Sequence, residues 1–174
     1  MDYKKYYYLE QYLFEDVKDN FKKRGYLTAD EFFCIIIWKA NRSKTIIKKR
    51  LKRFDKDLNK VVRKITSELF NKENPKEKLR YLMFQCGFRL PMASAILTVL
   101  YPDEFTVYDV RVCDMLRDFH KLQNKTKFDK IWEGYEVFKK TVSNAVPEEA
   151  NLRDKDRCLW GKSFCEDLKE FIGK

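Results

Sequence analysis

The chain contains few histidines, glycines and prolines, and each of these shortages argues against a particular kind of site or fold. Its 174 residues include one histidine, five glycines and four prolines. One histidine leaves few nitrogen ligands for a zinc site, and so few glycines and prolines disfavour a turn-rich β fold. The longest apolar run, Phe32–Trp38, is far too short to cross a bilayer. We therefore expect a helical protein with no metal, no cofactor and no membrane partner.

Cys-x-x-Cys pairs are also absent. The five cysteines are scattered along the chain and odd in number, a pattern that does not build a disulfide framework. The N-terminal residues MDYKKYYYLEQYLF lack the apolar core of a signal peptide. We expect reduced, mostly buried thiols in a cytoplasmic protein.

Basic residues, in contrast, are in excess. The chain has 37 Lys and Arg against 27 Asp and Glu, a formal net charge of +10. Such a surplus favours a polyanionic partner, most simply double-stranded DNA. An AT-rich genome, whose composition favours lysine, would produce the same excess without any such partner. The length and the apolar fraction of 44% suit one helical domain over residues 1–174, or two lobes of about 1–74 and 75–174 that share a cleft.

Helix start and stop signals predict an all-α fold of about eight helices. Thr28–Glu31 is a capping box that opens a helix reaching about Ala40. Ser43 can cap a helix over Lys44–Phe54, whose basic outer face is either phosphate-facing or simply solvated. The last helix, about Asp154–Ile172, would pack one apolar face inward. That face consists of Cys158, Leu159, Phe164, Leu168 and Phe171.

The most informative stretch runs from Leu79 to Cys113. Apolar residues at i, i+3, i+4 and i+7 predict an amphipathic helix, which Gly87 would end in a left-handed conformation. Pro91 suits the first turn of a second helix, and that helix would end before Pro102. Asp109 then stands in the N-cap position of a further helix.

This arrangement resembles the helix-hairpin-helix plus Asp module of the endonuclease III-like superfamily of DNA base-excision glycosylases. The hairpin pattern of that family, Gly-apolar-Gly-x-x-x-Ala, corresponds to Gly87–Ala93. The catalytic Asp of the family follows after one helix and a loop, and the same offset leads to Asp109. The resemblance is specific over about Leu79–Leu116. It implies a glycosylase-like fold around a helix-hairpin-helix at about residues 79–100.

Two departures from the family pattern affect the expected chemistry. The second glycine of the hairpin is Arg89, which could add a charged contact to phosphate or be an ordinary exposed arginine. Some members attack the sugar with a lysine in the second half of the hairpin, where this chain has Leu90–Met92. The resemblance therefore implies a monofunctional glycosylase that forms no Schiff base through that position.

Cys158 and Cys165 match the opening spacing of the iron–sulfur loop of some members, but the following ligands are missing, so no cluster is expected.

The resemblance implies that Asp109 is the catalytic residue. Its carboxylate would stabilise the positive charge that develops on the sugar and would orient the attacking water. The alternative is a plain N-cap. The hairpin would offer backbone N–H groups to a DNA phosphate, and its DNA-binding residues would be Gly87, Phe88, Arg89, Leu90, Met92 and Ala93. Further candidates to face DNA, chosen for charge and position, are Lys39, Arg42, Lys48, Lys49 and Arg111.

Hydrolysis of an N-glycosidic bond in a duplex requires the base to be flipped into a pocket, which aromatic side chains commonly line. The candidates for that lining are Trp38, Tyr101, Tyr108, Trp132 and Tyr135. Two other functions stay open: a non-catalytic helix-hairpin-helix DNA-binding protein, and a helical protein-interaction module. The oligomeric state is not indicated by the sequence.

Overall fold

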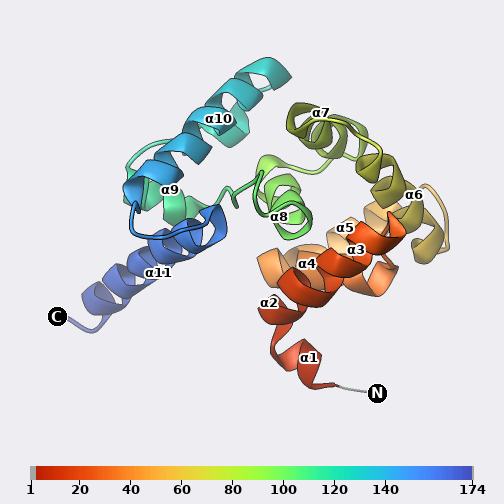
Figure 1. Ribbon diagram of the computed structural model, residues 1–174, viewed down its shortest axis with the longest axis horizontal. Helices are drawn as coiled ribbons and strands as arrows, with labels where there is room; N and C mark the ends of the chain where they lie inside the picture. Colours follow the sequence, from red (N-terminus) through yellow and green to blue (C-terminus); the bar gives the residue numbers. More distant parts are fainter. Residues whose placement is uncertain (1–2, 174) are drawn as a thin grey trace.

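The computed structural model describes residues 3–173, and within that range every regular element is a helix (Figure 1). The N-terminal helical run continues from Lys4 to Arg24 with one break at Tyr8. It consists of α1 (Lys4–Tyr7), α2 (Leu9–Tyr12), the π-helical segment η1 (Leu13–Val17) and α3 (Lys18–Arg24). Leu13, Val17 and Phe21 are fully buried along it, so a single apolar face holds the run against the rest of the protein.

Local capping signals set the starts of the next helices. The capping box predicted at Thr28 is formed, with reciprocal hydrogen bonds between Thr28 and Glu31 at the start of α4 (Ala29–Ala40). Asp57 caps α6 (Leu58–Phe70) by accepting from the N–H groups of Asn59 and Lys60. Between them lie the 3₁₀ turn η2 (Asn41–Ser43) and α5 (Lys44–Leu51).

The stretch around Gly87 folds as two helices joined by a tight turn. Asn74 caps α7 (Pro75–Arg80), which continues through the π-helical η3 (Tyr81–Gln85). Gly87 has a φ of 72°, the left-handed conformation predicted for it. The second helix, α8 (Leu90–Leu100), has Pro91 in its first turn, and all of its residues except Pro91 are buried. α8 is therefore a core helix.

The remaining elements follow a loop after α8. They are α9 (Val110–Leu116), the 3₁₀ turn η4 (Leu122–Asn124), α10 (Phe128–Ala145) and α11 (Leu152–Phe171). In Figure 1, α9, α10 and α11 lie together on one side of α8, and α3 to α7 lie on the other. One continuous core of buried side chains runs from Tyr12 to Leu159 and includes both groups of helices. With the η segments joined to the helices that they extend, the described residues form nine helices, one more than expected.

Three details of the helix prediction were wrong. Ser43 makes no capping hydrogen bond, and the helix after it ends at Leu51 instead of Phe54. The helix expected after Asp109 was to carry Val112, Met115, Leu116 and Phe119, but α9 ends at Leu116 because Arg117 adopts a left-handed conformation with a φ of 55°. On α11, only Leu159 of the predicted apolar face is buried. Cys158, Phe164, Leu168 and Phe171 are exposed, since the C-terminal half of α11 extends away from the core (Figure 1).

Candidate functional site

Asp109 lies at the end of the loop that joins α8 to α9. Its carboxylate oxygen Oδ1 accepts a hydrogen bond from the backbone N–H of Arg111 at 3.0 Å, as an N-cap does. The predicted capping position is therefore confirmed. An N-cap hydrogen bond is compatible with both a catalytic role and a purely structural role of Asp109.

The loop before Asp109 is held by buried hydrogen bonds. Asp156 of α11, which is 2% exposed, accepts from the hydroxyl of Thr106 at 2.9 Å and from the N–H of Val107 at 3.2 Å. The hydroxyl of Tyr135 accepts from the N–H of Thr106 at 3.1 Å and donates to its carbonyl oxygen at 2.6 Å. Burial raises the pKa of Asp156 although Arg153 and these donors oppose the shift. The network fixes the backbone that carries Asp109.

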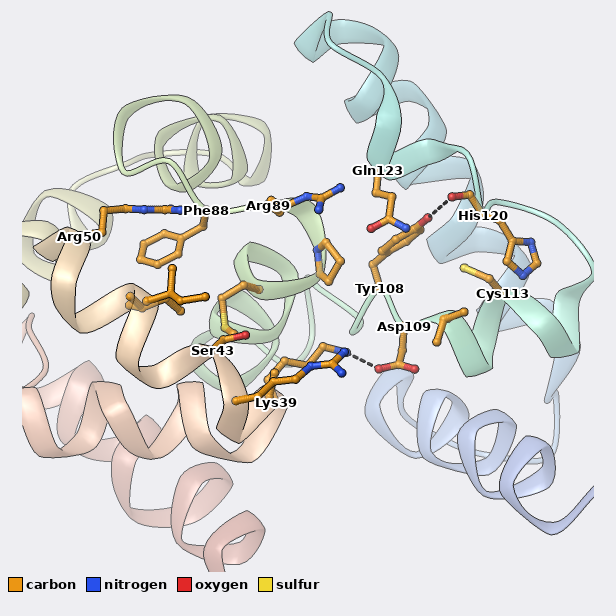
Figure 2. A pocket seen from close by; sticks show the side chains of 17 residues that line it. Lys39, Ser43, Arg50, Phe88, Arg89, Tyr108, Asp109, Cys113, His120 and Gln123 are labelled. Carbon is orange, nitrogen blue, oxygen red and sulfur yellow. Dashed lines mark hydrogen bonds and ion pairs between the residues drawn. The ribbon is translucent and has the colours of Figure 1, made fainter. Parts of the chain in front are cut away.

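The other oxygen of Asp109 contacts a residue from a distant part of the chain. The ammonium group of Lys39, at the C-terminal end of α4, donates to Asp109 Oδ2. The side chains are 12% and 21% exposed, so the ion pair is largely shielded from solvent. Figure 2 shows this pair bridging the gap between α4 and the start of α9. Lys39, a candidate chosen only for its charge, is thus brought directly to the candidate catalytic carboxylate.

A cleft of about 580 Å³ opens beside this pair. We call it the cation cleft, because four basic side chains line it against one carboxylate, that of Asp109. Those basic residues are Lys39, Arg42, Arg50 and Arg89, and the lining also includes Ser43, Phe88, Pro91, Met92, Tyr108, His120 and Gln123 (Figure 2). The cleft therefore combines the end of α4, α5, the hairpin and the start of α9 in one concave surface. Its charge suits an anionic ligand.

Arg50 lines the cleft although it was not among the candidates to face DNA; the sequence placed it only on the basic outer face of the helix after Ser43. Its guanidinium donates to the carbonyl oxygen of Gly87, the residue that makes the turn between η3 and α8. The contact links α5 to the hairpin. In the sequence, Arg50 is one of several consecutive basic residues of α5. No local pattern distinguishes it from Lys48 or Lys49 as a residue that would line the cleft.

The side chains of the hairpin are mostly turned into the protein. Phe88, Leu90, Met92 and Ala93 are at most 8% exposed, so any contact that they make with DNA would pass through the backbone. Several of their N–H groups are already used: Phe88 donates to Leu82, and Met92 and Ala93 both donate to Arg89. The exposed hairpin residues are Gly87 and Arg89. Among the basic side chains of the cleft, Lys39 contacts Asp109 and Arg50 contacts the Gly87 carbonyl oxygen, so Arg42 and Arg89 are the two best placed to meet an anion.

The other candidate residues lie outside the cation cleft. Lys48 and Lys49 are exposed on α5 and do not line it. Arg111 turns toward α11, where it pairs with Asp167 and lies over the rings of Trp160 and Phe164 at 5.3 and 5.5 Å. The structure therefore brings Lys39, Arg42, Arg89 and Asp109 together and separates them from these three.

Within residues 3–173, no group of three or more His, Cys, Asp or Glu side chains is placed to hold a metal ion. His120 reaches the cleft but pairs with Asp114 of α9 at 2.6 Å. None of the described helices offers an apolar stretch that could span a membrane.

Comparison of the chain with protein-family models, curated proteins and solved structures finds no match in any of the three.

Proposed function

We propose that this protein binds double-stranded DNA and hydrolyses the N-glycosidic bond of a flipped base, as a monofunctional glycosylase does. The observation that carries the proposal is the position of Asp109. The carboxylate that the family resemblance selects lies in a cleft lined by four basic side chains, one of which contacts it. The helix, turn and helix around Gly87 support a helix-hairpin-helix within a glycosylase-like fold.

In this mechanism the cation cleft binds the sugar–phosphate backbone. Arg42, Arg50 and Arg89 neutralise phosphate charge, which positions the duplex without reading its sequence. Breaking the glycosidic bond leaves positive charge on the sugar, and the carboxylate of Asp109 stabilises it. Asp109 also orients a water molecule whose oxygen attacks the anomeric carbon, and its carboxylate accepts the proton that the water loses. The electron pair of the broken bond leaves with the base, which takes up a proton from solvent. Lys39 and the N–H of Arg111 hold the carboxylate in place.

The test is base release by Asp109→Asn, measured on duplexes with single damaged or deaminated bases. Asparagine retains an oxygen that can cap α9, so the fold and duplex binding should survive while base release falls by at least 100-fold, the scale of a lost electrostatic stabiliser. Asp103→Asn, at an exposed position outside the cleft, is the matched control and should retain activity. Full activity of Asp109→Asn would refute the mechanism.

The second candidate is a non-catalytic DNA-binding protein. It is favoured by the fact that both oxygens of Asp109 already have partners, which suits a structural residue. It predicts salt-sensitive duplex binding with no base release from any substrate. If the protein did not bind duplex even at low salt, a helical protein-interaction module would be the better description.

A further inference from the structure

The second half of α11 is not covered by the rest of the described chain. The buried residues of this helix are Asp156, Leu159 and Ser163, and every described residue from Phe164 onward is exposed. Figure 1 shows this half extending away from α9 and α10. A helical segment this short is marginally stable in water when nothing packs against it. A partner that covers it would therefore stabilise it.

The exposed half of α11 carries a narrow apolar seam. Four residues follow one another at spacings of three, four and three, which is the a and d pattern of a coiled coil. They are Gly161, Phe164, Leu168 and Phe171, and we call them the α11 seam. Phe164 and Leu168 are each 47% exposed, and Phe171 is 89% exposed. The outer positions of the same repeat are occupied by Lys162, Glu166, Lys169 and Glu170.

Gly161 is the least expected member of the seam. A glycine inside a helix lowers its stability by about 1 kcal/mol relative to alanine. A Cβ added at Gly161 would meet no atom within 4 Å, so nothing in the described part of the chain requires so small a residue there. A gap in a coiled-coil seam is a place that a large side chain of a neighbouring helix can fill.

The seam is complementary to itself. Gly161 and Phe171 lie at equal distances in the sequence from Glu166. Phe164 and Leu168 also lie at equal distances from it. In an antiparallel pair with a two-fold axis beside Glu166, Phe171 of each copy therefore lies over Gly161 of the other, and large residues meet small ones. A parallel pair would place glycine opposite glycine and leave a void.

Charge also favours this surface for the meeting of two copies. The chain has a formal net charge of +10, so two copies repel each other in general. Beside the seam, however, Asp167 is paired with Arg111 of α9. The Arg111 guanidinium lies over the rings of Trp160 and Phe164 at 5.3 and 5.5 Å. The border of the seam therefore combines a matched acid and base with aromatic surface.

We propose that the α11 seam is a dimerisation surface, on which two copies of this chain pair through antiparallel α11 helices. The seam covers less than two heptads, so the buried area falls short of the roughly 800 Å² per partner of a standard interface. The dimer is therefore weak, with a dissociation constant in the range of tens of micromolar. None of the four seam residues lines the cation cleft, so this inference is independent of the proposed function.

Sedimentation velocity from low to high micromolar concentration tests the surface. Wild type should pass from monomer to dimer, and Phe171→Ala and Gly161→Leu should each raise the dissociation constant at least about fivefold. The first change removes the protruding ring and the second fills the gap that receives it. Lys162→Gln, on the outer side of α11, is the matched control and should change the constant by less than about twofold. A wild-type chain that stays monomeric throughout would overturn the proposal.

The double variant Gly161→Leu with Phe171→Ala tests the antiparallel pairing. It exchanges the small and the large residue of one layer, so the dissociation constant should return to within about threefold of wild type. A parallel pair would be strengthened by Gly161→Leu alone, because that change would fill its void. Tighter association of Gly161→Leu, or losses that add in the double variant, would therefore overturn the proposal.

Two controls exclude other causes of a change in mass. Reducing agent is present throughout, and Cys165→Ser should dimerise as wild type does, which excludes a disulfide through the exposed Cys165. Gly161 and Phe171 are exposed in the single chain, so the variants should retain the helix content of wild type in circular dichroism. A dimer that neither single variant weakens would place the interface elsewhere and refute the seam.

Discussion

Lys39 and Asp109, 70 residues apart in the chain, form an ion pair that joins the end of α4 to the start of α9. Neither local sequence nor helix geometry requires this contact. It brings a cation to the carboxylate selected by the family resemblance. The two residues line both the cation cleft and a second cavity of about 330 Å³, which Trp38 and Trp160 also line.

Lys39→Gln should destabilise the protein and impair the site. The substitution leaves Asp109, which is 21% exposed, without its counter-charge, at a cost of about 1–3 kcal/mol in the free energy of unfolding. Urea denaturation would measure the loss. The double variant Lys39→Gln with Asp109→Asn should recover much of it, because neither charge is then left alone. Additive effects of the two substitutions would show that the pair is not coupled.

Gly87→Ala should lower the free energy of unfolding by about 1 kcal/mol because of the left-handed backbone at this position. The space is adequate, since an added Cβ would lie 3.5 Å from the Arg50 guanidinium. Gly161→Ala is the matched control: it lies inside α11 with nothing within 4 Å of the added Cβ. That change should raise stability by about 0.5–1 kcal/mol. Equal effects of the two changes in urea denaturation would contradict the role of Gly87 as the turn residue.

Arg42→Gln should weaken duplex binding and reduce its salt dependence. If Arg42 contacts one phosphate in the cation cleft, the slope of log K against log salt should become less steep by about 0.9. Lys48→Gln removes the same charge outside the cleft and should change the slope little. Binding titrations over a range of salt concentrations measure both. A larger effect of Lys48 would place the phosphate contacts on the outer face of α5.

Glu10→Gln should remove a stability term that depends on pH. Burial alone would raise the pKa of Glu10, but Arg153 and Arg157 outweigh it and hold the pKa below the ordinary value of 4.5. A lowered pKa contributes stability above the unfolded value, and this is lost as the pH falls through the folded value. Wild type should therefore exceed Glu10→Gln in thermal stability at about pH 6–7, with the gap closing below about pH 4. Glu148→Gln, at an exposed position, should show no such trend.

Thiol labelling should distinguish two classes of cysteine. Cys34, Cys86 and Cys113 are buried, and burial raises the pKa of both Cys86 and Cys113 to about 11. Cys158 and Cys165 are exposed on α11. A disulfide reagent should therefore react quickly with two thiols in the native protein and with all five after denaturation. Rapid reaction of a third thiol would show that the core around α8 or α9 opens readily.

Much of the local structure could be read from the residues alone. The capping box at Thr28, the left-handed Gly87 and the N-cap Asp109 each depend on contacts within a few residues, and short-range signals of that kind survive in any tertiary context. The all-helical class follows from the same signals. The apolar face predicted for α11 failed because periodicity marks a face of a helix without showing whether anything covers it.

The sequence by itself thus determined the all-helical class, the caps at Thr28 and Asp109, and the carboxylate at the start of α9. Tertiary structure alone decided which cations reach that carboxylate. Lys39 and Arg50 enter the cation cleft, whereas Lys48, Lys49 and Arg111 do not, and Trp160 becomes a cavity wall although no pattern singled it out. The physical reason is that these side chains meet through the packing of helices distant in sequence. The residue type alone does not show which side of its helix packs against the rest of the protein.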